Sequence, residues 1–138
     1  TALAESEIIT DVLIPAGRPR QGWSFQEMVR RTSDFAIVAV AALVELDERA
    51  DTIAAARVAL AGVADRVVLA SPELLAGLTG SALTGGDDVA GAVAARIAAS
   101  LEPADDVHAS GEYRRRLVRV LTARALREAC ARAAGAAA

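Results

Sequence analysis

The side chains best suited to chemistry gather in residues 22–38, GWSFQEMVRRTSDFAIV. This stretch holds the only tryptophan and both phenylalanines of a chain that is 3% aromatic. An exposed Trp23 or Phe25 could stack on a flat ligand, and Arg30 or Arg31 could bind an anion. The alternative is structural: a hairpin with two aromatic side chains in the core and an Arg–Asp pair across its turn. Spacing alone leaves both interpretations open.

The other reactive side chains point to no catalytic or metal site. His108 and Cys130 are the only histidine and cysteine, which excludes an internal disulfide and a Cys/His metal cluster. Two aspartate pairs, 87–88 and 105–106, stand beside expected helix starts, where carboxylates cap the first turn. Glycine-rich nucleotide motifs and nucleophile motifs are absent. We therefore expect no catalytic residue and no metal ligand.

The elements that must position residues 22–38 are strands. Alternating and β-branched patterns predict an extended segment or strand over 7–14, strands over 23–30, 35–46 and 53–63, and a short extended piece at 67–69. Residues 31–34 form the turn of a hairpin. The strand over 35–46 is apolar on both faces, so we expect it to be central in the sheet.

The second half of the chain changes to a helical pattern. Ser71-Pro72-Glu73 predicts a helix start, a second helix extends from residue 88 to 101, and Ser110 caps a third over about 111–134. Tyr113 and Arg124 fall on the apolar arc of the last helix, where a guanidinium would need a carboxylate or carbonyls. The prediction is an α+β fold, with an antiparallel sheet of three to four strands followed by a three-helix bundle on one face.

Size and charge limit the partners. A chain of 138 residues is expected to form a single domain over 1–138. Its net charge of −3 argues against nucleic acid or an anionic membrane as the main partner. An apolar run long enough for a membrane span is absent, as is a signal-peptide pattern, so we expect a cytoplasmic protein.

Six short motifs, in this order, resemble a known family. They are Glu7-x-Ile9-Thr10-x-Val12-x-Ile14-Pro15, Gly22-Trp23-Ser24-Phe25, Arg30-Arg31-x-x-Asp34-Phe35-Ala36, Val58–Ala64, Ser110-x-x-Tyr113-Arg114-Arg115 and Arg124-Ala125-Leu126. Together they cover about residues 5–130 and resemble the C-terminal domain of the FAD-binding medium subunit of molybdenum hydroxylases. That group includes carbon monoxide dehydrogenase and xanthine dehydrogenase. The resemblance implies an antiparallel sheet carrying a three-helix bundle.

The resemblance also implies a place in an electron-transfer chain. Electrons would pass from a 2Fe–2S small subunit to FAD, after substrate oxidation at the molybdenum cofactor of a large subunit. An N-terminal FAD-binding domain, expected to be absent from this chain, would hold most of the FAD. The C-terminal domain would close one side of the flavin pocket without binding FAD or catalysing by itself. Matching positions for the cofactor-binding wall are Ile9, Trp23, Phe25, Arg30 and Asp34.

This chain departs from the family pattern beside the aromatic residues. Relatives often carry a lysine after the aromatic residue, whereas this chain has Gln26 and Glu27, so Arg30 would have to supply the cation. Tyr113 and Arg114 would fix the last helix onto the sheet. A different class of function stays open, namely a free-standing interaction or assembly domain that binds no cofactor.

Overall fold

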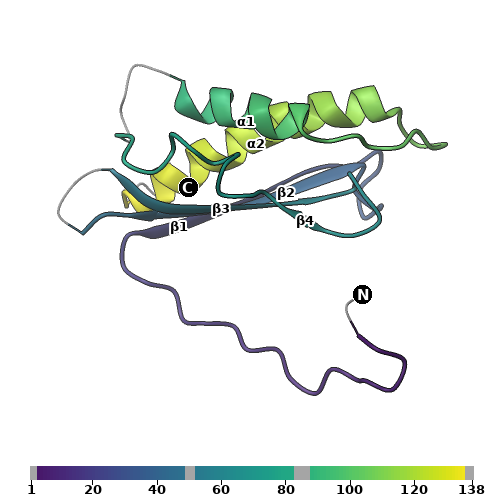
Figure 1. Ribbon diagram of the computed structural model, residues 1–138, viewed down its shortest axis with the longest axis horizontal. Helices are drawn as coiled ribbons and strands as arrows, with labels where there is room; N and C mark the ends of the chain where they lie inside the picture. Colours follow the sequence, from purple (N-terminus) through teal and green to yellow (C-terminus); the bar gives the residue numbers. More distant parts are fainter. Residues whose placement is uncertain (1–2, 49–51, 83–87, 136–138) are drawn as a thin grey trace.

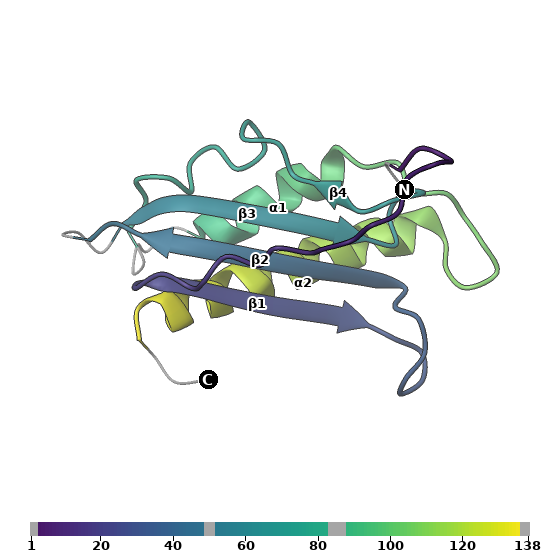
Figure 2. The same ribbon diagram turned by 90° about the horizontal axis from the view of Figure 1, so that it is seen from below.

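A four-stranded antiparallel sheet with helices on one face organises the chain in the computed structural model, which describes residues 3–48, 52–82 and 88–135 (Figure 1). The strands succeed one another in the order β1–β2–β3–β4 across the sheet. α2 packs against β1 and β2, and α1 packs beside α2 (Figure 2). The α+β prediction with antiparallel strands is confirmed. The elements are β1 Gln21–Met28, β2 Val38–Leu46, β3 Ile53–Ala61, β4 Val68–Leu69, α1 Val89–Ala99 and α2 Gly111–Ala133.

The core lies between the sheet and the two helices. Alternation along β2 and β3 sends every second side chain toward the helices. The helices meet them with β-branched and leucine side chains, so a continuous apolar layer forms. The larger side chains that are at most 1% exposed in this layer are Val38, Val40, Val44, Val58, Leu60, Val93, Ile97, Val118 and Leu126.

Close contact between β1 and α2 depends on a glycine. A Cβ atom added at Gly22 would overlap the carbonyl oxygen of Ala129 and the backbone nitrogen of Ala133. The next helix-facing residue of β1, Ser24, is 1% exposed. Because side chains alternate along a strand, Trp23 and Phe25 point to the face that the helices leave open.

The predicted helix after Ser71 is wrong. Residues 72–80 form successive turns, with the Leu74 N–H donating to the Ser71 carbonyl and the Leu78 N–H to the Leu75 carbonyl, each at 3.1 Å. Gly77 and Gly80 adopt φ angles of 90° and 81°, in the left-handed region that interrupts a right-handed helix. The described residues therefore carry two helices, and the three-helix bundle is not formed.

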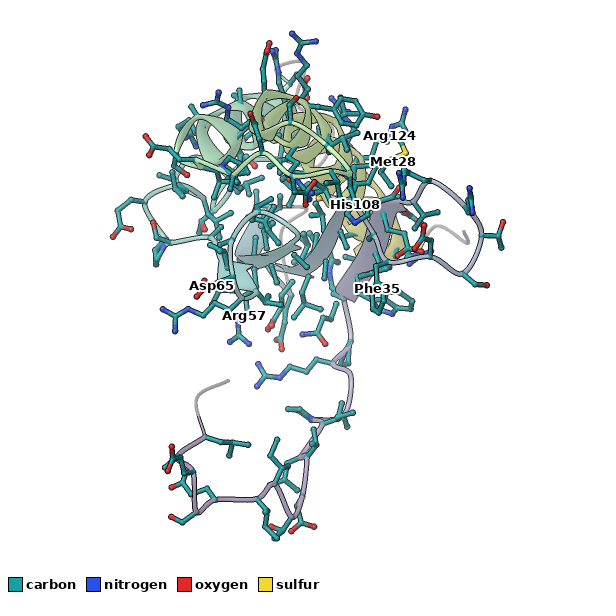
Figure 3. The ribbon with its side chains drawn as sticks, turned by 90° about the vertical axis from the view of Figure 1, so that its right-hand side faces the viewer. Met28, Phe35, Arg57, Asp65, His108 and Arg124 are labelled. Carbon is teal, nitrogen blue, oxygen red and sulfur yellow. The ribbon has the colours of Figure 1, made fainter. Side chains whose placement is uncertain are left out.

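Residues 7–14 leave the sheet as an extended arm and form no strand. The arm runs along the side of the sheet opposite the helices (Figures 1 and 3). Ile8 and Leu13 are largely exposed. The β-branched pattern correctly indicated an extended backbone, but it carried no information about a partner strand.

The face that α2 buries differs from the predicted arc. Its buried stripe includes Arg114, so Tyr113, one residue earlier, points about 100° away and is exposed. Arg124 is also exposed and needs no buried partner, whereas Thr122 lies in the core. The expected cap is confirmed: the Ser110 hydroxyl accepts a hydrogen bond from the Tyr113 N–H. Asp88 caps α1 in the same way, while Asp87 lies outside the described residues.

Candidate functional site

Two aromatic side chains stand on the open face of β1. Trp23 is 61% exposed and Phe25 is 56% exposed. The neighbouring strand places Leu43 opposite Trp23 and Ala41 opposite Phe25, which makes the surrounding surface apolar. The structural alternative, with both aromatics in the core, is therefore wrong. Its Arg–Asp pair is also missing, because no ion pair joins Arg30 or Arg31 to Asp34 within residues 3–48.

A hollow of about 520 Å³ adjoins Trp23 on this open face. It lies between the base of the N-terminal arm and the first three strands, and an ion pair of 3.5 Å joins Arg18 to Glu45 beside it. Arg57 extends from β3 to the side of the sheet away from the helices (Figure 3). The hollow is lined by Ile14, Pro15, Ala16, Arg18, Gln21, Trp23, Leu43, Glu45, Ala55, Ala56 and Arg57.

Leu43 and Arg57 line this hollow and were missed as site residues. The strand register places Leu43 opposite both Trp23 and Arg57, so the three residues form one row across the open face. Drawing the predicted hairpins residue against residue would have placed Trp23 opposite Ala42 and Leu43 opposite Ala56, one residue out of register, so the predicted turns do not give this row.

A second hollow, of about 200 Å³, lies at the far end of β1. Phe35 is 96% exposed there, because β2 begins at Val38 and leaves residues 35–37 in the loop. The Asp34 carboxylate accepts a hydrogen bond from the Phe35 N–H at 2.9 Å. Figure 3 looks onto this end, where His108 lies nearer the middle of the molecule than Phe35. The lining residues are Arg30, Asp34, Phe35, Ala36, Ile37, Asp106, His108 and Arg114.

Arg114 holds this end together. Its Nη1 donates to the carbonyl oxygens of Ile37, at 2.5 Å, and Gly62, at 2.8 Å. Its Nη2 donates to an Asp106 carboxylate oxygen at 2.6 Å. The expectation that Arg114 fixes the last helix onto the sheet is confirmed, while exposed Tyr113 does not share the role.

Asp106 is itself fixed by the loop that precedes α2. One carboxylate oxygen accepts the backbone N–H groups of Ala109, at 2.9 Å, and His108, at 2.8 Å. These hydrogen bonds, and after them the hydrogen bond from Arg114, lower the pKa of Asp106 to about 2. Asp106 therefore stays ionised through the neutral range and keeps its hydrogen bond to Arg114.

The five predicted site residues do not share one pocket. Trp23 lines the larger hollow, Arg30 and Asp34 line the smaller one, and Phe25 and Ile9 line neither. A strand rises about 3.3 Å per residue, so Trp23 and Arg30 stand roughly 20 Å apart. Ile9 is exposed on the arm. The structure thus presents two separate groups at opposite ends of β1.

Two further features were sought among the described residues, a group of metal ligands and a helix that could span a membrane. Within residues 3–48, 52–82 and 88–135, no group of three acidic, histidine or cysteine side chains is placed to hold a metal ion. Neither α1 nor α2 is long and apolar enough to cross a membrane.

Comparisons with known proteins agree with this fold. Over 132 residues, the chain is 39% identical to the nicotine 6-hydroxylase medium subunit of Paenarthrobacter nicotinovorans, covering 96% of this chain and 44% of that subunit. It is 30% identical to the carbon monoxide dehydrogenase medium chain of Hydrogenophaga pseudoflava, covering 97% and 45%. The chain therefore spans less than half the length of these curated relatives.

Solved structures of similar enzymes contain the same fold. A carbon monoxide dehydrogenase from Hydrogenophaga pseudoflava, which lacks the Mo-pyranopterin moiety of its cofactor, superposes with a TM-score of 0.77 and 28% identity, covering 86% of this chain and 40% of that one. Quinoline 2-oxidoreductase from Pseudomonas putida 86 gives a TM-score of 0.70 and 32% identity, covering 86% and 39%. Residues 23–129 match the family described as the CO dehydrogenase flavoprotein C-terminal domain. The chain belongs to this family, as the six sequence motifs indicated.

Proposed function

We propose that this chain forms one wall of the flavin site in the FAD subunit of a molybdenum-dependent oxidoreductase. Membership of the flavoprotein family supports the general role. The single observation that carries the proposal is the pair of aromatic side chains, Trp23 and Phe25, exposed side by side on a hydrogen-bonded strand. Large exposed apolar surfaces of this kind are typical of binding sites.

The residues present fit a flavin ring on one side. A flavin is flat and aromatic, and Trp23 and Phe25 offer faces on which such a ring can stack. Leu43 and Ala41 make the neighbouring surface apolar, and Arg57 is a hydrogen-bond donor at the end of the same row. Bound FAD would supply the chemistry of accepting electrons and passing them on, and this chain would bind and orient the ring.

The distance between the aromatic pair and the Arg30–Asp34 pair suggests that they would contact different parts of the ligand. A three-ring flavin head cannot span the roughly 20 Å between Trp23 and Arg30. We therefore assign the ring to Trp23 and Phe25, with Ile9 of the arm closing over it. Arg30 and Asp34 would meet another part of the dinucleotide or the surrounding protein.

The wider assembly is part of the same proposal. An N-terminal FAD-binding domain would complete the pocket, and a 2Fe–2S small subunit and a molybdenum-cofactor large subunit would be the partners. The relatives are medium subunits or chains of a nicotine hydroxylase and a carbon monoxide dehydrogenase, which supports this arrangement. We place the complex in the cytoplasm.

The decisive experiment is FAD titration of the deflavinated complete subunit that contains this chain, monitored by flavin fluorescence. We expect Phe25→Ala to weaken FAD binding about five- to tenfold, because an aromatic stack contributes about 1 kcal/mol and 1.4 kcal/mol is a factor of ten. Tyr113→Ala is the matched control, since it removes an exposed aromatic ring from α2 and should leave FAD affinity unchanged.

Two results would count against the proposal. If Trp23→Ala and Phe25→Ala both bind FAD as the unmodified subunit does, these rings are not part of the flavin wall. If the complete natural polypeptide takes up no flavin at all, the free-standing interaction domain becomes the better interpretation.

A further inference from the structure

We infer that Arg132 is a positioning residue for Trp23, holding the indole ring with one face under its guanidinium so that a flat ligand meets the opposite face. The inference rests on the proposed function, because it concerns the orientation of a ring in the flavin wall. It also places a cation at this wall, where Gln26 and Glu27 stand in place of the lysine expected by resemblance.

The geometry around Arg132 supports a fixed ring. The guanidinium carbon lies 4.7 Å from the centroid of the Trp23 ring, within the range of a cation–π contact. Nη1 donates to the Trp23 carbonyl oxygen at 2.7 Å, and Nη2 donates to Glu128 at 2.5 Å. The guanidinium therefore has two polar anchors, and it cannot leave the ring without breaking at least one of them.

Glu128 connects this contact to the buried face of β1. Its second carboxylate oxygen accepts from the Ser24 hydroxyl at 2.7 Å and from the Gln26 amide at 2.5 Å. Hydrogen bonding, chiefly from Ser24, lowers the pKa of Glu128, which therefore stays ionised at neutral pH. Glu128 thus binds Ser24 and Gln26 on the helix-facing side of β1, while Arg132, one turn later in α2, contacts Trp23.

The path of Arg132 explains why only one ring face is covered. Trp23 points away from α2, and β1 is the edge strand of the sheet. A side chain from α2 can reach the ring only around this edge, and Arg132 is long enough to do so. The other face of the ring is left for a ligand, in agreement with its 61% exposure.

Tryptophan fluorescence of this chain tests the inference directly, because Trp23 is the only tryptophan. We expect Arg132→Ala to lower the emission anisotropy of Trp23 and to raise its acrylamide quenching constant about twofold. Arg132→Lys should restore part of the effect, because an ammonium can lie over the ring but lacks the fork that reaches both anchors.

Arg116→Ala is the matched control. Arg116 pairs with Glu112 on the same helix at the same four-residue spacing, but this pair is exposed and Trp23 lies at the other end of the helix. A merely structural role would give the two alanine variants the same fluorescence. If Arg132→Ala leaves both fluorescence measures as in the unmodified chain, Arg132 is only a surface ion pair and the inference is overturned.

FAD titration of the complete subunit separates this inference from the proposed function. Weaker FAD binding together with the fluorescence change supports both. A fluorescence change with unaltered FAD affinity supports the positioning of Trp23 by Arg132 and counts against the flavin wall. Unchanged fluorescence overturns the positioning whatever the FAD affinity is.

Discussion

The two ends of α2 hold the sheet through arginines of different character. Arg114, in the first turn, is 7% exposed and donates only to groups that are fixed in the fold. Arg132, in the last turn, has a side chain that is 27% exposed and covers an exposed ring. Similar arginine-to-carbonyl contacts thus differ in what they would serve: stability where the guanidinium is buried and, by the inference above, orientation of a ring where it is half-buried.

The difference arises from what else brings each end together. At the Arg132 end, Gly22 allows the backbones of β1 and α2 to touch, so no side chain is needed to fill the space between them. At the Arg114 end, Ile37 and Gly62 lie in loops whose carbonyl oxygens find their donor in the guanidinium. A buried guanidinium is tolerated there because both of its terminal nitrogens donate hydrogen bonds.

Arg114→Ala should produce the largest effect in the molecule. Its removal leaves the carbonyl oxygens of Ile37 and Gly62 without this donor, and each buried unpaired acceptor costs about 1–3 kcal/mol. We expect the free energy of unfolding to fall by about 3 kcal/mol, measured by urea denaturation with circular dichroism. A domain of ordinary stability would still fold.

The control for this prediction is again Arg116→Ala. Its exposed ion pair with Glu112 should change the free energy of unfolding by less than about 1 kcal/mol. If the Arg114 and Arg116 variants lose equal stability, the contrast between a buried and an exposed arginine does not hold.

Asp106→Asn should lower the free energy of unfolding by an amount that depends on pH. The pKa of Asp106 in the folded chain is about 2, below its ordinary value of 3.8, so the ionised carboxylate stabilises the fold. This contribution is complete above about pH 4 and is lost as the pH falls through about 2. The stability difference between the unmodified chain and the variant should therefore shrink between about pH 4 and pH 2. A difference that stays constant over this range would contradict the assignment.

The sequence predicted the parts of the fold that depend on local alternation. The predicted bounds of β1, β2 and β3 lie within three residues of the observed ones. Alternating side chains gave this signal, because a sheet covered on one face requires them. The predicted helix after Ser71 was wrong although Ser71, Pro72 and Glu73 are typical of a helix start, because Gly77 and Gly80 adopt left-handed φ angles. A helix start signal caps the first turn and does not determine whether later residues continue the helix.

The sequence did not predict the contacts of the candidate site that join residues far apart in the chain. Trp23 and Phe25 were chosen for their scarcity, and the structure shows that they are exposed. Arg132 reaches Trp23 from the other end of the chain, around a strand edge, and no local pattern encodes such a path. Arg124 was placed wrongly on the apolar arc for a related reason, since the buried stripe of α2 is set by its contacts with the sheet and α1.

A substitution at Thr122 should give the smallest change in the free energy of unfolding, and it should be stabilising. It lies on α2 between the two arginine contacts, is fully buried, and its hydroxyl has no hydrogen-bond partner among the residues that the structure describes. Thr122→Val keeps the shape of the side chain and removes the unpaired hydroxyl, so the free energy of unfolding should rise by about 1 kcal/mol. Thr122→Ala is the comparison, because it removes the hydroxyl and also creates a small cavity. If the valine variant is less stable than the unmodified chain, the hydroxyl is hydrogen-bonded in solution. The middle of α2 would then be held by a polar contact, as its ends are.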